Sequence, residues 1–215
     1  MHRQPVFQLR QATHPLKELI VILNDDGLKL SDYMTKARKD PQARVYRLPE
    51  RHSLASCLNF GVRQARYDRI AKFDDDDYYG PEYLADSLRT MQRSGADIVG
   101  KRAHYMYLEG AKVLLFRYPD QENRKVSLVQ GATLLVKRHV FGRVGFRGRD
   151  QGECVRFCID SRKSGFTVYA GSRRHFAAFR RKNAKGHTWK ASDRLLLSRN
   201  AKVLRVRDVR AFVSE

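Results

Sequence analysis

Short apolar runs and helical patterns alternate along the first hundred residues. Residues 18–24 form a continuous apolar run of strand length that ends in the polar sequence NDDG, and residues 43–49 give a shorter strand-like run. Residues 53–65 place apolar side chains at helical spacing, and Ser53 is suited to cap the amino terminus of that helix. Residues 69–74 are expected to form a third strand. This alternation predicts an α/β fold.

A second helix is expected over residues 81–95, where Pro81 stands in the first turn and Gly95 at the end. The order of strands and helices favours a mainly parallel sheet in this part of the chain. Ligands bind such sheets at the carboxyl ends of the strands. Two acidic segments, residues 24–26 and 74–77, lie at such ends.

Beyond residue 100 the pattern changes to strand-like runs joined by short turns, so we expect this half to be more antiparallel. The expected elements are strands over residues 103–109, 111–117 and 132–138, a helix over residues 151–164 and a strand over residues 166–170. No internal repeat or low-complexity linker divides the sequence. We therefore interpret residues 1–215 as one domain.

The composition is that of a globular protein, with 215 residues of which 42% are hydrophobic. The sequence contains no apolar run of about 18 residues and no signal-peptide pattern, so the expected location is the cytoplasm. The odd number of cysteines suits a reducing compartment. Cys154 and Cys158 are one helical turn apart and are expected to pack in the core rather than to bind a metal.

The chain is strongly basic, with a formal net charge of +20. Half of that excess lies after residue 170, where 13 Lys and Arg stand against three acids. Such a surface suits an anionic partner, which can be nucleic acid, a membrane face, an anionic polymer or a phosphorylated substrate. A solvated basic surface without a specific partner is the alternative.

Four consecutive carboxylates, at residues 74–77, directly follow the third expected strand. Adjacent like charges repel one another, and nothing within the run neutralises them. Hard divalent cations such as Mg²⁺ and Mn²⁺ bind carboxylate oxygens and would offset the cost of crowding them. The run therefore indicates a divalent-cation site, with a solvated acidic turn as the alternative.

Six segments together resemble the inverting family-2 glycosyltransferases with the GT-A fold. They are KELIVILNDD, NFGVRQA, IAKFDDDDYYGPEYL, GATLLVKRHVFGRVGF, GEC and HTW, in the family's order between Lys17 and Trp189. The resemblance implies a three-layer α/β sandwich. It also implies transfer of a sugar from a nucleotide-diphosphate donor, UDP-linked by preference, to an acceptor hydroxyl with inversion. Cell-envelope or spore-surface polysaccharide synthesis is the expected setting.

The resemblance assigns the acidic run to donor binding. Asp74 and Asp76 look like the family's Asp-x-Asp pair, one at the ribose or a metal-bound water and the other at the metal, with Asp77 adjacent. A metal bridging both phosphates would neutralise the charge that develops on the leaving nucleoside diphosphate. Asn24 and Asp25 resemble the polar strand end that contacts the base or ribose, and a capping turn is their alternative role.

A basic cluster near the carboxy terminus offers contacts for the donor diphosphate. Arg180, Arg181 and Lys182 can hold phosphate oxygens, the arginines as forks and the lysine as a point charge. His187, two residues before the single tryptophan, is interpreted as a neutral imidazole ligand of the metal or as a donor to the diphosphate.

Inversion also requires a general base for the acceptor's proton. The family often carries this base as the Asp of a Glu-Asp pair at the start of a helix, and here the pair reads Glu153-Cys154. Because a neutral thiol is a poor base for a sugar hydroxyl, Glu153 is favoured and Asp150 is the second candidate. The cysteine is also compatible with a different acceptor chemistry or with the loss of efficient transfer.

The resemblance divides the domain into a nucleotide-binding half over residues 17–100, an acceptor half over residues 101–189 and a basic tail over residues 190–215. The family begins with a strand that forms one wall of the base pocket. The sequence before Lys17 resembles instead the end of the helix that follows this strand, so we expect the strand to be missing. Other residues, or another subunit of a homo-oligomer, would then supply base recognition.

Two further function classes compete with this interpretation. Nucleic-acid binding rests on charge alone, because no helix-turn-helix, zinc-finger or RNP signature accompanies it, so no specific nucleic acid is expected as a partner. A metal-dependent nuclease or phosphotransferase would also use clustered aspartates, but no Walker-type glycine loop is present. The favoured function is a cytoplasmic transferase with an anionic or glycan acceptor and peripheral contact with the inner membrane face.

Overall fold

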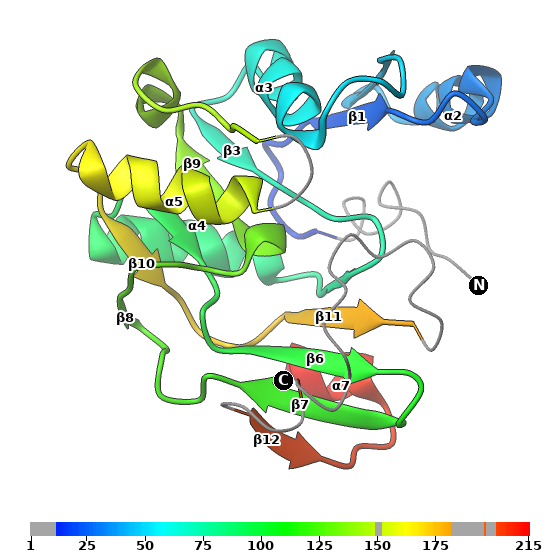
Figure 1. Ribbon diagram of the computed structural model, residues 1–215. Coiled ribbons are helices and arrows are strands. Elements are labelled where there is room, and N and C mark those ends of the chain that lie inside the picture. The colour runs from blue at the N-terminus through cyan, green and yellow to red at the C-terminus, as the bar shows by residue number, and fades with distance from the viewer. Residues whose placement is uncertain (1–11, 149–151, 182–195, 197–200) are drawn as a thin grey trace.

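The computed structural model describes residues 12–148, 152–181, 196 and 201–215. The first described elements are two parallel strands, β1 (Leu19–Leu23) and β2 (Ala43–Arg47), and two helices, α2 (Leu30–Ala37) and α3 (Leu54–Gln64). As predicted, Ser53 caps α3, because its side chain accepts a hydrogen bond from the backbone N–H of Ser56 at 3.2 Å. These elements lie together at one end of the molecule (Figure 1).

A five-stranded mixed sheet forms the centre of the molecule (Figure 1). Its strand order is β3 (Arg69–Ala71), β9 (Leu135–Lys137), β5 (Ile98–Gly100), β10 (Val168–Ala170) and β8 (Arg124–Lys125). Successive side chains of a strand point to opposite faces. Ile98 therefore joins the core beneath helix α5 (Glu153–Lys163), and Val99 joins the core beneath helix α4 (Tyr83–Ser94). The two helices thus cover the two faces of this sheet.

A second five-stranded sheet lies on the other side of the molecule from β1 and α3 (Figure 1). Its strand order is β12 (Ala201–Leu204), β7 (Val113–Arg117), β6 (His104–Leu108), β11 (Phe176–Arg180) and β4 (Tyr78–Tyr79). One face buries Phe176 against Tyr79 and Tyr83. The opposite face buries Tyr105 and is covered by helix α7 (Val209–Ser214). Strand β4 directly follows the acidic run, so this sheet helps to position it.

The elements predicted from the periodicity are confirmed wherever the structure describes them. An observed strand or helix lies within each range expected between residues 18 and 170, and Gly95 ends α4 with a left-handed φ of 69°. Helix α2 was not predicted, although Leu30, Tyr33, Met34 and Ala37 stand at helical spacing; it has only 8 residues, and no side chain caps its start. Cys154 and Cys158 are free and lie on the buried face of α5, in the core, as expected.

Strand directions follow the sequence prediction in part. The ladders β1–β2, β5–β10 and β6–β11 are parallel, and the other six described ladders are antiparallel, as expected for the second half. In the first half β1 pairs parallel with β2, and β5 pairs parallel with β10, whereas the expected third strand, β3, pairs antiparallel with β9. The apolar run of a strand indicates burial, but it does not specify the direction of the partner strand.

The end of the chain is integrated into the second sheet. Residues 201–214 were expected to belong to a basic tail, and they form β12 and α7. The carboxylate of Asp208 caps α7 by accepting hydrogen bonds from the N–H groups of Arg210 and Ala211. The Phe212 ring packs against Tyr105 with the ring centroids 5.5 Å apart. No helix in the described part of the chain is long and apolar enough to cross a membrane.

Candidate active site

The acidic run forms the turn between β3 and β4, and buried hydrogen bonds fix its backbone. The Tyr79 hydroxyl accepts a hydrogen bond from the backbone N–H of Asp74 and donates one to the carbonyl oxygen of Ala132, both at 2.8 Å. Burial, with the charges of Asp74 and Asp77, raises the pKa of Tyr79 well above its usual range, so the phenol remains a donor. The first aspartate is therefore held at a defined place.

The last carboxylate of the turn contacts the second sheet. Asp77 Oδ1 accepts a hydrogen bond from the backbone N–H of Phe179 on β11 at 3.0 Å. Burial, followed by the charges of Asp74 and Asp76, raises the pKa of Asp77 well above its usual range. The residue after Phe179 is Arg180, whose exposed fraction is 9%. A crowded set of acids and one predicted phosphate-binding arginine thus lie at the same place.

Lys72 connects this turn with helix α5. Its ammonium forms an ion pair with the carboxylate of Asp74, and its side chain is 9% exposed. Burial alone would lower the pKa of Lys72, but the charge and the hydrogen bond of Asp74, with the charge of Glu153, outweigh this effect and raise the pKa. The start of α5 therefore lies within electrostatic reach of the acidic turn.

The start of α5 holds the candidate base. Glu153 is half-buried in the first turn of the helix, and Cys154 is buried with its Sγ 3.8 Å from the carbonyl oxygen of Gly131. Burial is the main reason that the pKa of Cys154 is raised to about 12. The thiol is neutral near neutral pH and cannot serve as a base. Glu153 is the carboxylate that the structure places here, while Asp150 lies outside the described residues.

The polar end of β1 forms a turn, which is the alternative to nucleoside binding that the sequence offered for Asn24 and Asp25. The Asn24 amide donates a hydrogen bond to the carbonyl oxygen of Pro49 at 2.8 Å. Asp25 Oδ1 accepts a hydrogen bond from the backbone N–H of Gly27, also at 2.8 Å. The first contact connects the end of β1 to the segment between β2 and α3, and the second closes the turn after β1. Contact of Asn24 or Asp25 with a nucleoside stays a prediction.

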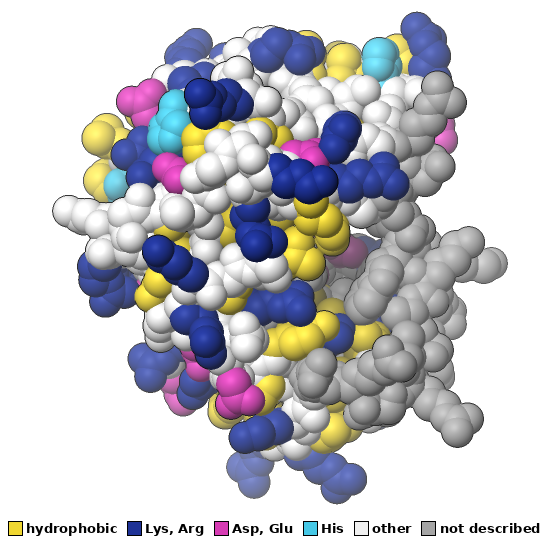
Figure 2. Space-filling view, turned by 60° about the vertical axis from the view of Figure 1, so that its left-hand side comes forward, with side chains coloured by type: hydrophobic (Ala, Val, Ile, Leu, Met, Phe, Trp, Pro, Cys, Tyr) yellow, Lys and Arg dark blue, Asp and Glu magenta, His cyan; other side chains and the backbone are white. Residues whose placement is uncertain are grey.

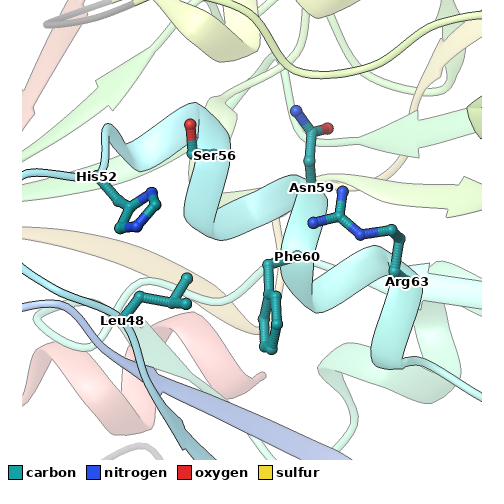
Figure 3. Close-up of a pocket in the computed structure, with 6 residues that line it drawn as sticks. All are labelled: Leu48, His52, Ser56, Asn59, Phe60 and Arg63. Carbon is teal, nitrogen blue, oxygen red and sulfur yellow. The ribbon is translucent and has the colours of Figure 1, made fainter.

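A pocket of about 310 Å³ adjoins that segment (Figure 3). Its lining consists of Leu48, His52, Ser56, Asn59, Phe60 and Arg63. Leu48 directly precedes Pro49, which accepts the Asn24 hydrogen bond, so the pocket and the end of β1 are neighbours. Apolar Leu48 and Phe60 stand beside the polar groups of His52 and Arg63, a mixture typical of small-molecule sites.

The predicted site residues fall into three groups. Asp74, Asp76 and Asp77 belong to one turn, Glu153 lies within electrostatic reach of it through Lys72, and Arg180 follows the residue whose N–H contacts Asp77. Asn24 and Asp25 lie at the end of β1, in a different sheet, and Arg181 follows β11 at the surface. Lys182 and His187 lie outside the described residues.

Sequence reasoning missed Lys72, Tyr79 and the pocket. The signal for Lys72 was present, because side chains two residues apart in an extended segment share a face, and Asp74 is two residues away. The contact of Tyr79 with Ala132 joins residues 53 positions apart and leaves no local signal.

The acidic turn fits a divalent cation that is shared with a phosphate. No group of three His, Cys, Asp or Glu side chains within the described residues forms a ready-made metal site. Mg²⁺, however, is usually held by one or two carboxylates together with substrate phosphates and waters. Burial raises the pKa of Asp77, the charges of Asp74 and Asp76 raise it further, and a nearby cation would relieve that second effect.

Comparison with solved structures finds the same fold in TarS from S. aureus. A crystal structure of TarS 1–349 in complex with UDP-GlcNAc matches with a TM-score of 0.69 and 16% identity, over 87% of this chain and 56% of that one. The complex of TarS 1–349 with UDP matches with a TM-score of 0.62 and 15% identity, over 81% and 55% of the two chains. The chain thus spans little more than half the length of these structures.

The sequence comparison identifies the family. No curated protein is significantly similar in sequence to the chain. The model of Glycosyl transferase family 2 matches residues 6–145, which is well over half of the chain. That range contains β1, the acidic turn and the lining of the pocket. The predicted resemblance to family 2 is therefore confirmed: the chain belongs to glycosyl transferase family 2 and has the GT-A fold.

Proposed function

We propose that this glycosyltransferase moves a sugar from a UDP-linked donor to an acceptor hydroxyl, with inversion at the anomeric carbon. The proposal rests mainly on the position of Glu153. Its carboxylate interacts electrostatically with Lys72, which pairs with Asp74 of the acidic turn. A donor site and the base that serves the acceptor must lie close together, and this arrangement supports the proposal. The UDP and UDP-GlcNAc complexes of TarS, which has the same fold, support the choice of a UDP-linked donor.

Mn²⁺ or Mg²⁺ is the proposed cofactor, with Asp74, Asp76 and Asp77 as ligands and His187 as a further candidate. When bound, the cation would supply positive charge opposite the departing diphosphate. Arg180 is adjacent to the contact between Asp77 and β11, and its guanidinium offers paired donors to phosphate oxygens. Arg181 and Lys182 follow in sequence and are assigned the same role.

In the proposed reaction, the oxygen of the acceptor hydroxyl forms a bond to the anomeric carbon. The bond from that carbon to the diphosphate oxygen breaks, and UDP leaves with its electron pair. The hydroxyl proton passes to the carboxylate of Glu153, with Asp150 as the second candidate. Cys154 cannot take this proton, because only its thiolate form could accept one. With a pKa of about 12, the thiol stays almost fully protonated at neutral pH.

The nucleoside is proposed to bind at the end of β1 and in the adjoining pocket. The hydrogen bond of Asn24 to Pro49 holds that strand end beside the pocket wall, and Asp25 lies next to it. The pocket volume of about 310 Å³ is at the lower end of the range for small-molecule sites. His52 and Arg63 supply polar groups on its lining (Figure 3).

The acceptor is proposed to be an anionic glycan of the cell envelope or spore surface, met in the cytoplasm at the inner membrane face. Lys and Arg side chains are spread over the face in Figure 2, with fewer acidic side chains between them. With a formal net charge of +20, this surface would attract an anionic polymer or membrane over a distance set by the salt concentration.

Calorimetric titration tests the donor assignment. UDP should bind in the presence of Mn²⁺ and more weakly with a chelator, and ADP should bind more weakly than UDP under the same conditions. Absence of UDP binding under both conditions would contradict the proposal. Inversion is tested separately by measuring the anomeric configuration of the product by NMR, since a retained configuration would exclude direct displacement with Glu153 as the base.

A further inference from the structure

Lys72 is a buried cation within the acidic turn, and the reaction described above gives it no role. Its side chain is 9% exposed, and its ammonium pairs with Asp74, the first carboxylate of the predicted metal-binding set. A lysine is seldom buried unless it is paired, because removing its charge from water is costly. A buried lysine at this place therefore needs an explanation in terms of the carboxylates around it.

The backbone holds both partners of this ion pair. The N–H of Lys72 donates a hydrogen bond to the carbonyl oxygen of Leu134 at 2.8 Å, beside strand β9. The N–H of Asp74 donates to the Tyr79 hydroxyl, also at 2.8 Å. The side chains share a face because they are two residues apart in an extended segment. The pair is thus part of the fold rather than a chance contact at the surface.

The charge of Lys72 acts on more than one carboxylate. It interacts with Glu153 at the start of α5 and opposes the effect of Asp74 and Asp76 on Asp77. Lys72 is therefore a buried positive charge among several acids in a region where a divalent cation is expected to bind. A cation arriving alone would have to compete with the ammonium for Asp74.

We propose that Lys72 is a built-in counter-ion of the acidic turn, which keeps the divalent cation from binding before the nucleotide diphosphate does. This inference rests on the proposed function. A lysine ammonium is a point charge with three donors on a flexible stem. Once a diphosphate is present, its oxygens offer the ammonium a second partner and offer the cation further ligands. Asp74 then becomes available, so cation and nucleotide bind together.

The test measures Mn²⁺ binding without nucleotide, by calorimetry, in the wild-type chain and in Lys72→Met. We expect weak binding to the wild type and an affinity for Mn²⁺ at least about tenfold higher in the variant, because the competing charge is gone. Lys72→Gln, which keeps a hydrogen-bond donor to Asp74, should behave in the same way and serves if the methionine variant does not fold. Circular dichroism monitors folding.

Lys101→Met is the matched control. Lys101 is also buried and lies 3.5 Å from a carboxylate, that of Asp86 on α4, but it is not among the charges that act on Asp77. This variant should bind Mn²⁺ as weakly as the wild type. Equal Mn²⁺ affinity in the wild type and in both Lys72 variants would overturn the inference. The comparison contains no nucleotide, so a failure of the wild type to bind UDP would count against the proposed function instead.

Discussion

Individual side chains in the acidic turn have different surroundings, although the sequence repeats one residue four times. Asp74 is paired with Lys72, and Asp77 is hydrogen-bonded to the backbone of β11. Asp75 is exposed, whereas Asp76 is half-buried and its charge acts on Asp77. The four positions of the run therefore differ in burial and in partners, and the assignment of Asp74 and Asp76 to donor and metal binding stays a prediction.

Replacing Asp76 by Ala should abolish the contribution of Mn²⁺ to UDP binding and leave the fold intact. Removing one carboxylate relieves repulsion within the turn but also removes a proposed ligand of the cation. UDP affinity is measured by calorimetry with Mn²⁺ and with a chelator. Asp75→Ala, at the exposed position, is the control and should behave as the wild type. An Asp76→Ala variant that keeps the full Mn²⁺ effect would refute the ligand assignment.

Replacing Glu153 by Gln should lower kcat by about 10² to 10⁴-fold, the usual contribution of a general base, with little change in UDP affinity. Glutamine preserves the size of the side chain but cannot accept the acceptor's proton. Cys154→Ser at the neighbouring position is the control for the local fold and should retain most of the turnover. If Glu153→Gln turns over normally, Asp150 becomes the candidate, and Asp150→Asn is the next variant.

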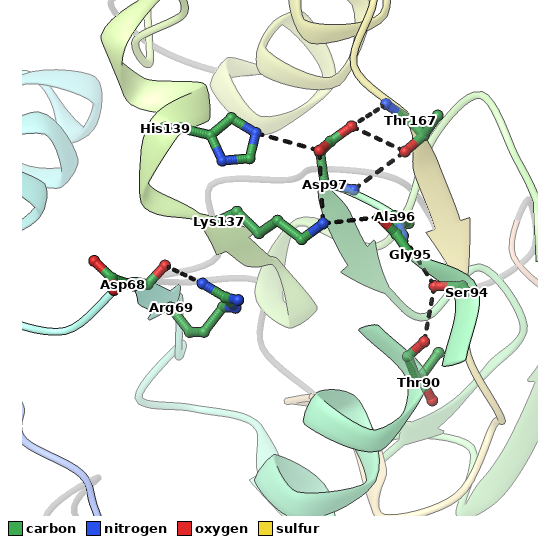
Figure 4. A network of polar contacts seen from close by, with 10 residues as sticks. All are labelled: Asp68, Arg69, Thr90, Ser94, Gly95, Ala96, Asp97, Lys137, His139 and Thr167. Atoms are coloured by element: carbon green, nitrogen blue, oxygen red, sulfur yellow. Dashed lines mark hydrogen bonds and ion pairs between the residues drawn. The ribbon is translucent and has the colours of Figure 1, made fainter. Parts of the chain in front are cut away.

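At the level of elements, a clamp of polar contacts joins three neighbouring strands of the central sheet (Figure 4). Asp97, just before β5, accepts hydrogen bonds from the backbone N–H and the hydroxyl of Thr167, just before β10, at 2.9 and 3.0 Å. Its carboxylate also contacts Lys137 of β9 and His139, at 3.8 and 3.2 Å. The clamp fixes the order of the strands at the end of the sheet away from the acidic turn.

The clamp should make stability depend on pH. Burial alone would raise the pKa of Asp97, but the hydrogen bonds from Thr167 and the charges of its neighbours outweigh this effect and lower the pKa. The unfolded chain therefore takes up this proton at a higher pH than the folded chain does. The stabilisation is present above the unfolded pKa of about 3.9 and is lost as the pH falls through the lower folded pKa.

We expect Asp97→Asn to be less stable than the wild type by about 1–3 kcal/mol near neutral pH, with the difference shrinking as the pH falls below about 4. Urea unfolding at several pH values measures it. Asp160→Asn, which removes the partner of the exposed Arg147, is the control for a surface ion pair and should cost less than about 1 kcal/mol. A difference for Asp97→Asn that is independent of pH would mean that its charge does not contribute.

The same elements indicate how far sequence reasoning reaches. Local signals suffice to predict α3 and α4. Ser53 caps the start of α3 by a contact three residues away, and Gly95 caps the end of α4 by a contact four residues away. The contact of Asp77 with Phe179 joins residues 102 positions apart, and no pattern in a single sequence specifies it. The motif of the acidic turn was therefore predictable. Its contact with the second sheet, its ion pair with a buried lysine and its separation from the end of β1 could be seen only in the three-dimensional structure.

Two surfaces of the whole molecule differ in how they should bind anions. The acidic turn is partly enclosed, and its contacts with a diphosphate would be short-range, through Arg180 and a cation. The exterior is broadly basic, with a formal net charge of +20, and would attract any polyanion without specific contacts (Figure 2). Salt screens the second kind of interaction far more than the first, because the Debye length falls to about 8 Å at physiological ionic strength.

Salt should therefore separate donor binding from polyanion binding. We expect the affinity for duplex DNA, used as a generic polyanion, to fall by about 10³-fold or more between about 50 and 200 mM NaCl if several phosphates are neutralised. The affinity for UDP with Mn²⁺ should change by less than about tenfold over the same range, because few charges are exchanged. Calorimetry measures the UDP affinity and fluorescence anisotropy the DNA affinity. The opposite result would be DNA binding that persists at the higher salt together with UDP binding that is lost. It would favour nucleic-acid recognition over sugar transfer as the function of the protein.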